Sequence, residues 1–178
     1  IASYELTWHE LIGACAQTGK RLILSTGMAT LGEVMDAVSP ITCRHGSTRH
    51  MAVLHCVSNY PARQADCNLS ALRTLREHLA AGIKIGYSDH TGRSDVVRRA
   101  IDRWGAEVIE FHFCGGGGLT SCEPGSWSFD SARALIEDYK ADGDGIKQPQ
   151  PCEMQERRWR RDPSDGLRPM KELRGEFK

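Results

Sequence analysis

Short apolar runs alternate with amphipathic stretches over about the first 140 residues. Runs of strand length occupy 22–24, 51–57, 83–88 and 108–113, and residues 1–5 have the pattern of the end of a further strand. The segments between them carry apolar residues at helical spacing, such as Leu69, Leu72, Leu75 and Leu79. This alternation predicts β-α-β units around a buried parallel sheet. Five such strands fit an open sheet or the second half of an eight-stranded barrel, and periodicity alone leaves both open.

Polar residues and one proline mark the expected helix ends. The T-x-x-E sequences at 7–10 and 30–33 have the pattern of capping boxes, in which the threonine and the glutamate each satisfy a backbone N–H. Pro40 is expected to end the helix that begins after the second capping box. Ser128 or Asp130 is expected to cap the last regular helix.

The composition changes after residue 140. Glycine, proline and charged residues dominate from there, as in D-G-D-G at 142–145. We therefore predict a strand–helix domain over 1–140 and an irregular polar tail over 141–178. The chain begins without a methionine and in the middle of a strand pattern, so we expect it to be the later part of a longer protein.

Charge and hydropathy argue against several classes of protein. The 23 basic and 23 acidic side chains cancel, so net charge indicates neither a nucleic-acid partner nor a membrane surface. The apolar runs are far shorter than the ~20 residues that a membrane helix needs. Seven cysteines without a C-x-x-C pair predict reduced thiols in a cytoplasmic protein, and their spacing argues against a cysteine zinc site.

Two histidines stand where chemistry is expected in a parallel sheet. His90 follows the fourth predicted strand, and His112 lies at the end of the fifth. Functional groups in strand–helix folds gather past the carboxyl ends of the strands, so the two imidazoles could share one metal ion. A single strand-end histidine is more often a structural residue, whereas a pair at adjacent strand ends favours the metal. Asp89 could orient an imidazole or cap a loop, and the sequence leaves both open.

Four motifs together carry a family resemblance. They are L-I-L-S-T-G-M-A-T at 22–30, L-H-C-V-S-N-Y-P at 54–61, G-Y-S-D-H-T at 86–91 and V-I-E-F-H-F at 108–113. In this order and spacing they resemble the sialic acid synthase family, which comprises N-acetylneuraminate synthase and relatives making legionaminic or pseudaminic acid. The resemblance covers about residues 1–140. It implies an α/β fold of the (β/α)8 TIM-barrel type, of which this chain would hold about strands 4 to 8.

The resemblance also implies an activity. Family members condense phosphoenolpyruvate with an N-acylated hexosamine, typically N-acetylmannosamine, to give a nonulosonic acid and phosphate. They use a divalent metal, for which we expect manganese first and magnesium or cobalt as alternatives. His90 and His112 match the metal ligands, and the metal would polarise the sugar aldehyde as a Lewis acid. Glu5 matches a glutamate near the sugar and the metal, which makes it a third candidate catalytic residue.

Further positions match substrate-binding residues of the family. Ser3, Ser25 and Ser88 match hydroxyls on the phosphoenolpyruvate side, where a hydroxyl can donate to a phosphate oxygen. Tyr60 matches a tyrosine on the sugar side. Ser58 and Asn59 are both candidates for one further phosphoenolpyruvate-binding position.

The departures from the family pattern set limits on the activity. The first three strands and the lysine expected just before Ile1 are missing, and 114–124 carries glycines and cysteines where the family has an acidic stretch. We therefore predict that the chain alone does not turn over, and that open strand edges favour a homo-oligomer or other association. The alternative is a non-catalytic metal- or sugar-binding structural remnant of the barrel. A Schiff-base aldolase using Lys84 is a third reading, disfavoured because Lys84 lies near the start of its strand.

Overall fold

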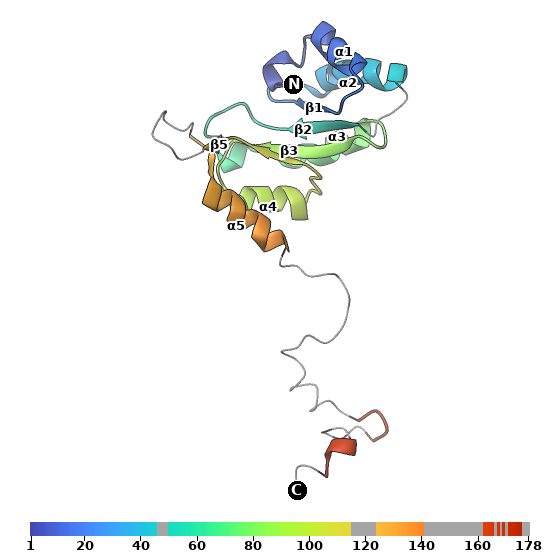
Figure 1. Ribbon diagram of the computed structural model, residues 1–178, viewed down its shortest axis with the longest axis vertical. Helices are drawn as coiled ribbons and strands as arrows, with labels where there is room; N and C mark the ends of the chain where they lie inside the picture. The colour runs from blue at the N-terminus through green and yellow to red at the C-terminus, as the bar shows by residue number, and fades with distance from the viewer. Residues whose placement is uncertain are drawn as a thin grey trace. The chain divides into compact units, whose positions relative to one another are not determined.

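The computed structural model in Figure 1 describes most of the first 140 residues and short pieces of the tail. The described residues are 1–45, 50–114, 124–140, 162–165, 167, 169 and 171–175. They fall into two compact units, Ile1–Glu137 and Asp138–Lys178. The first unit contains the sheet and all the predicted site residues.

The first unit is built on a four-stranded parallel sheet. The strands are β1 (Leu22–Ser25), β2 (Met51–His55), β3 (Lys84–Asp89) and β4 (Ile109–Phe111), and they lie in the order β1-β2-β3-β4. The register sets Leu24 beside Val53 and Val53 beside Ile85. Sequential parallel neighbours are the outcome expected from β-α-β units, so the predicted parallel sheet is confirmed.

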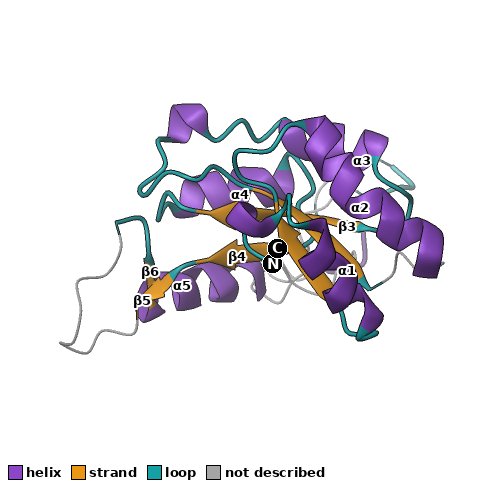
Figure 2. Ribbon diagram, turned by 90° about the horizontal axis from the view of Figure 1, so that it is seen from above, coloured by secondary structure: helices purple, strands orange, loops and turns teal. Residues whose placement is uncertain are grey.

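Helices alternate with these strands. They are α1 (His9–Gln17), α2 (Leu31–His45), α3 (Ala71–His78), α4 (Ser94–Asp102) and α5 (Phe129–Lys140), with short 3-10 turns η1 (Ser3–Glu5) and η2 (Gln64–Asp66). Helices α3 and α4 both contact β3, and α1 contacts α2 (Figures 1 and 2). A small second sheet pairs β5 (Phe113–Cys114) with β6 (Trp127–Ser128) in parallel.

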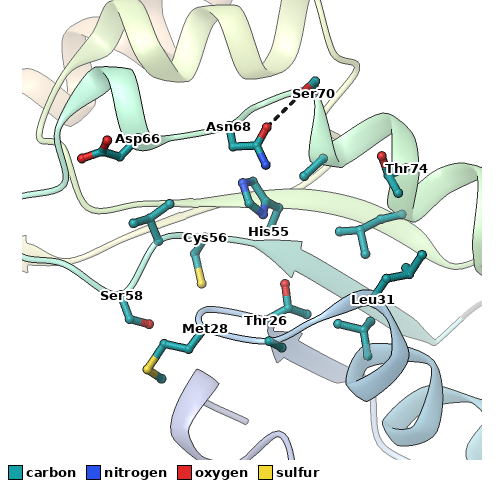
Figure 3. A pocket seen from close by; sticks show the side chains of 15 residues that line it. Thr26, Met28, Leu31, His55, Cys56, Ser58, Asp66, Asn68, Ser70 and Thr74 are labelled. Carbon is teal, nitrogen blue, oxygen red and sulfur yellow. Dashed lines mark hydrogen bonds between the residues drawn. The ribbon is translucent and has the colours of Figure 1, made fainter.

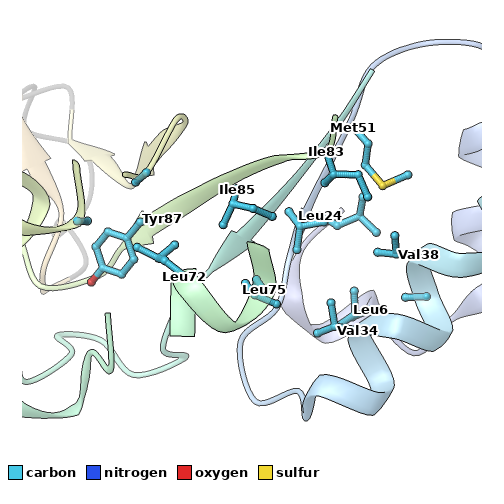
Figure 4. Close-up of a cluster of buried hydrophobic side chains, with 14 of the residues drawn as sticks. Leu6, Leu24, Val34, Val38, Met51, Leu72, Leu75, Ile83, Ile85 and Tyr87 are labelled. Atoms are coloured by element: carbon cyan, nitrogen blue, oxygen red, sulfur yellow. The ribbon is translucent and has the colours of Figure 1, made fainter. Parts of the chain in front are cut away.

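Alternate residues of each strand face opposite sides of the sheet. On the helix side, Leu24, Val53 and Ile85 join Val34 of α2 and Leu72 of α3 in one buried cluster (Figure 4). The residues of opposite parity include Ile23, Ser25, Leu54, Ser88 and Glu110, and these line a cavity. One face of the sheet therefore holds the fold together, and the other face carries the polar side chains.

The predicted strand over residues 1–5 is wrong beyond its first residue. The Ile1 amino group donates to the Ile23 carbonyl (2.8 Å), and the Ser25 N–H donates to the Ile1 carbonyl (3.0 Å). These two bonds are the pattern of a parallel ladder and place Ile1 at the edge of β1. The chain then turns into η1 and buries Leu6 in the core, so the strand ends there.

One predicted capping box is confirmed and the other is wrong. The Thr30 N–H donates to Glu33 Oε2 (2.7 Å), and the Glu33 N–H donates to Thr30 Oγ1 (3.3 Å), which is the reciprocal pattern. Helix α1 instead begins at His9, and Trp8 stands at its N-cap without a side-chain bond. The Thr7 hydroxyl is therefore one residue too early to cap α1.

Two other helix predictions have different outcomes. Pro40 lies inside α2 rather than at its end. It is exposed, whereas Val38 and Ile41 on either side of it are buried, so core packing holds the helix across the proline. Ser128 caps α5, because its hydroxyl accepts from the Ser131 N–H (3.1 Å).

The cysteines are of two kinds. Cys15, Cys56 and Cys67 are free, as predicted. Cys114 is disulfide-bonded, so the prediction of reduced thiols is wrong for this residue.

Across the described ranges, none of the helices has the length and hydropathy needed to cross a membrane.

The second unit is described only in part. It contains the short turn η4 (Lys171–Leu173). The Asp162 carboxylate accepts from the Ser164 hydroxyl and from the N–H groups of Lys171 (2.7 Å) and Ser164 (2.8 Å). These bonds, the hydroxyl bond most strongly, lower the pKa of Asp162 to about 2. Arg174 and Asp165 form an ion pair in which Arg174 Nη2 lies 2.7 Å from Asp165 Oδ1. The first part of the predicted tail, 141–161, lies outside the described residues.

Candidate active site

A cavity of about 370 Å³ lies on the face of the sheet opposite the buried cluster. Among the predicted site residues, Ser3, Ser25, Tyr60, Ser88, His90 and His112 line it. Glu5, Ser58 and Asn59 are not among its lining residues; Glu5 lies in η1, and Ser58 and Asn59 follow β2. The carboxyl ends of the parallel strands thus bring most of the predicted residues to one place.

His90 is fixed by the segment that follows β2. Its ring Nδ1 lies 2.7 Å from the Val57 carbonyl, and its backbone carbonyl accepts from the Ala62 N–H (2.9 Å). Because a carbonyl only accepts, Nδ1 must carry the hydrogen, and Nε2 of the neutral ring then holds a lone pair. A backbone carbonyl behind one ring nitrogen is the usual support of a histidine that binds a metal through the other.

The second histidine lies beside the first in a cluster of three rings. The ring centroids of His90 and His112 are 5.0 Å apart, and those of Tyr60 and His90 are 4.3 Å apart. The ring centroids of Tyr60 and His112 are 5.2 Å apart. Two converging imidazoles fit as two ligands of one metal ion. Within the described residues, no group of three or more His, Cys, Asp or Glu side chains is placed to hold a metal ion.

Glu110 is a cavity residue that the sequence reasoning missed. It lies on β4 and faces the cavity, and the Ser88 hydroxyl donates to its Oε2. Ser88 Oγ is also 3.3 Å from His90 Nε2. A charged residue inside the apolar motif V-I-E-F-H-F was the signal available in the sequence, because a strand buried on both faces has no ordinary place for a carboxylate.

Hydroxyl and thiol groups gather around Gly27 at one corner of the cavity. The Gly27 N–H donates to Ser3 Oγ (2.9 Å), which lies 3.2 Å from Cys56 Sγ. A side chain at Gly27 would place its Cβ 2.2 Å from Ser58 Oγ, so only glycine fits there. Burial, as the largest effect, raises the pKa of the Cys56 thiol. This thiol therefore stays protonated and can donate only a weak hydrogen bond.

Ser58 Oγ is buried and has no hydrogen-bond partner among the described residues. An unsatisfied buried hydroxyl costs about 1–3 kcal/mol, so a ligand oxygen that accepted its hydrogen would recover that energy. Ser58 lines a second cavity of about 520 Å³ rather than the first (Figure 3). The predicted phosphoenolpyruvate positions Ser3 and Ser58 therefore both lie against Gly27, although they line different cavities.

His55 and Asp89 have structural roles in this region. His55 Nε2 lies 2.8 Å from the Cys67 carbonyl, and burial lowers the pKa of His55, so the ring is neutral (Figure 3). Asp89 accepts from Thr91 Oγ1 (2.7 Å), the Gly92 N–H (3.0 Å) and Trp127 Nε1 (2.8 Å). Of the two roles left open for Asp89, the structure shows the capping of a loop.

The altered stretch 114–124 lies outside the described residues apart from its two ends.

Comparison with known proteins identifies the family of the strand–helix domain. The model described as the NeuB family matches residues 1–138. The chain belongs to the NeuB family. This finding confirms the family resemblance inferred from the four motifs.

Named relatives of the chain include synthases. The chain is 37% identical over 154 residues to the N,N'-diacetyllegionaminic acid synthase of Campylobacter jejuni, which covers 83% of this chain and 45% of that protein. It is 44% identical over 115 residues to an uncharacterised protein of Methanocaldococcus jannaschii, which covers 64% of this chain and 32% of that protein. The chain thus spans less than half the length of these curated relatives.

Solved structures show the same fold. The N-acetylneuraminic acid (sialic acid) synthetase of Leptospira borgpetersenii aligns with a TM-score of 0.63 and 32% identity, over 88% of this chain and 54% of that one. A putative spore coat polysaccharide biosynthesis protein E of Chromobacterium violaceum aligns with a TM-score of 0.69 and 26% identity, over 91% and 49% of the two chains. The predicted partial barrel of the TIM type is therefore confirmed.

Proposed function

We propose that this NeuB family chain carries part of the active site of a transferase that condenses phosphoenolpyruvate with an N-acylated hexosamine. The products would be a nonulosonic acid and phosphate. The observation that carries the proposal is the convergence of His90 and His112, with ring centroids 5.0 Å apart, on a cavity that is also lined by Ser3, Ser25 and Ser88. The relatives named as synthases support the same class of reaction.

The position of each hydroxyl group suggests which part of the substrates it would bind. Ser3 and Ser58 beside Gly27 would donate to phosphoenolpyruvate, and the glycine leaves room for the ligand to approach the backbone. Ser25 and Ser88 would donate from strands β1 and β3, which lie on either side of β2. Tyr60, which contacts both histidines, would face the sugar. Glu5 and Asn59 stay predictions, because neither lines the cavity.

A metal fits this site in part. His90 Nε2 and the His112 ring would provide two ligands, and Mn²⁺, Mg²⁺ or Co²⁺ would complete its shell with oxygen ligands. When bound, the metal would supply a Lewis acid for the aldehyde oxygen of the sugar. The Val57 carbonyl would keep the His90 ring in the tautomer that presents Nε2.

The charge of the cavity supports the prediction that the chain alone does not turn over. Its described lining includes Glu110 and lacks lysine and arginine side chains. Phosphoenolpyruvate is an anion, and anion sites normally rely on such cations. We therefore propose that cationic groups outside this chain complete the site, either in a preceding half barrel or in an associated copy. Among the described residues β1 and β4 are the outer strands of the sheet, and outer strands favour such association. A cytoplasmic location also stays a prediction.

The rival function is a non-catalytic remnant that binds a metal or a sugar. The anionic cavity wall favours it, because Glu110 alone would repel phosphoenolpyruvate. Joining the chain to the N-terminal half of a NeuB family relative separates the two. We expect the joined protein to release phosphate from phosphoenolpyruvate when an N-acylated hexosamine is present, and the chain alone to release none.

The matched control for that experiment is the same joined protein carrying His112→Ala. A synthase should lose phosphate release in this variant while it stays folded. A folded joined protein that stays inert with N-acetylmannosamine and with the diacetylated sugars of the legionaminic and pseudaminic relatives would support the remnant.

A further inference from the structure

Trp127 joins the two segments that carry His90 and His112. Its indole N–H donates to Asp89 Oδ2 (2.8 Å), and its backbone N–H donates to the His112 carbonyl (2.7 Å). Its ring packs on Phe111 with a centroid distance of 5.1 Å, and the side chain is only 1% exposed. One residue thus contacts the ends of both β3 and β4.

The bond to Asp89 acts on the loop that carries His90. Asp89 directly precedes His90, and its side chain is 0% exposed. Besides the indole, its carboxylate accepts from the Tyr87 hydroxyl (3.3 Å) and from Thr91 and Gly92, which directly follow His90. A buried carboxylate needs all of its donors, because an unpaired buried charge is strongly unfavourable. Removing the indole N–H would therefore disturb the residues on both sides of His90.

The segment of Trp127 also packs against the backbone of His90. Gly125 has a φ of +89°, and a Cβ there would lie 2.2 Å from the His90 carbonyl oxygen. The same Cβ would lie 3.3 Å from Pro61 Cα. Gly125, two residues before Trp127, therefore lies directly against the His90 backbone.

His112 lies at a change of strand partner. The pairing of β3 with β4 ends at Asp89 and Phe111. One residue later the chain continues as β5, which pairs with β6 through Phe113 and Trp127. His112 thus lies between Phe111, which pairs with β3, and Phe113, which pairs with β6, and Trp127 of β6 contacts Asp89 of β3.

We propose that Trp127 is a positioning residue that sets the geometry of the His90–His112 pair through Asp89 and the His112 carbonyl. Its importance for metal binding rests on the proposed function, whereas its effect on the two rings does not. The indole N–H is the decisive group, because a phenylalanine would keep much of the packing on Phe111 and lose the bond to Asp89.

The test is Trp127→Phe in the full chain, with two readouts. In the metal-free protein with labelled histidines, the nuclear Overhauser effect between the His90 and His112 rings reports their contact directly. In a Mn²⁺ titration followed by electron paramagnetic resonance, loss of a supporting residue behind a metal ligand should weaken affinity by about tenfold or more. We expect a weakened ring contact and weaker Mn²⁺ binding.

Trp104→Phe is the matched control, because it makes the same change at a half-buried tryptophan that lies near Arg73 and Arg103. It should alter neither readout. If Trp127→Phe does not fold, Asp89→Asn keeps the indole and tests the same connection with the same expectation. An unchanged ring contact in whichever variant folds overturns the proposal. If the wild-type chain binds no Mn²⁺ but the ring contact is lost in the variant, the metal function fails and the positioning role stands.

Discussion

Leu24 and Ile23 are neighbours on β1, yet Leu24 is 0% exposed beneath the helices and Ile23 is 49% exposed on the cavity side. The same contrast holds across the sheet. The helix side is apolar and closely packed, whereas the cavity side carries Glu110, the two histidines and the hydroxyl groups. The strands are therefore shared by two functions: one face stabilises the fold, and the other positions polar groups for a ligand.

The largest expected effect is on stability and separates the two faces. Leu24→Ala removes a side chain from the buried cluster and should cost about 2–5 kcal/mol of the free energy of unfolding. Ile23→Ala on the same strand is the matched control and should cost much less, because half of that side chain already contacts solvent. Urea unfolding measures both, and equal losses would contradict the division into two faces.

An intermediate effect is expected at the corner of the cavity. Gly27→Ala forces a Cβ against Ser58 and Ser3 and should cost about 1–3 kcal/mol through overpacking. Gly13→Ala in α1 is the control, because no atom lies within 4 Å of its added Cβ, and alanine favours a helix by about 0.5–1 kcal/mol. The midpoint temperature of thermal unfolding should fall in Gly27→Ala and rise in Gly13→Ala. A Gly27→Ala chain as stable as the wild type would show that Ser58 and Ser3 can make room for a Cβ at this position.

The smallest expected effect is a pH dependence on the helix side of β2. Burial lowers the pKa of His55, so the folded chain binds its proton less readily than the unfolded chain does. The stability due to neutral His55 is therefore present above the unfolded pKa of about 6.5 and is lost as the pH falls below it.

His55→Gln keeps a donor for the Cys67 carbonyl and should reduce the loss of stability between about pH 7.5 and pH 5.5, as measured by urea midpoints. His9→Gln replaces an exposed histidine and should leave the loss unchanged. The same pH dependence in His55→Gln as in the wild type would exclude His55 as its source.

The sequence predicts the helix side better than the cavity side, for a physical reason. Apolar periodicity reports burial, so β2 and β3 could be predicted from their apolar runs. The Thr30–Glu33 cap could be predicted from its local T-x-x-E motif. Pro40 was misjudged because core packing across the proline overrides a local preference. The early end of the strand at Ile1 likewise depends on the burial of Leu6, which is a long-range contact.

The site residues divide in the same way. His90 and His112 could be found because strand ends and motifs are visible in the sequence. Glu110 was missed although the sequence carries a signal for it, a carboxylate inside the apolar motif V-I-E-F-H-F. Trp127 was missed because its role depends on a bond to Asp89 across 38 residues. Contacts between residues so far apart leave no local pattern.

The measurement that tests the account most directly is Mn²⁺ binding by the native chain and by His90→Ala combined with His112→Ala, followed by electron paramagnetic resonance. His55→Ala combined with His78→Ala removes two histidines that do not line the cavity and is the matched control. We predict binding by the native chain and by the control, and loss of binding in the His90 and His112 double variant. No binding by the folded native chain, or equal binding by the double variant, would contradict a metal site at the cavity.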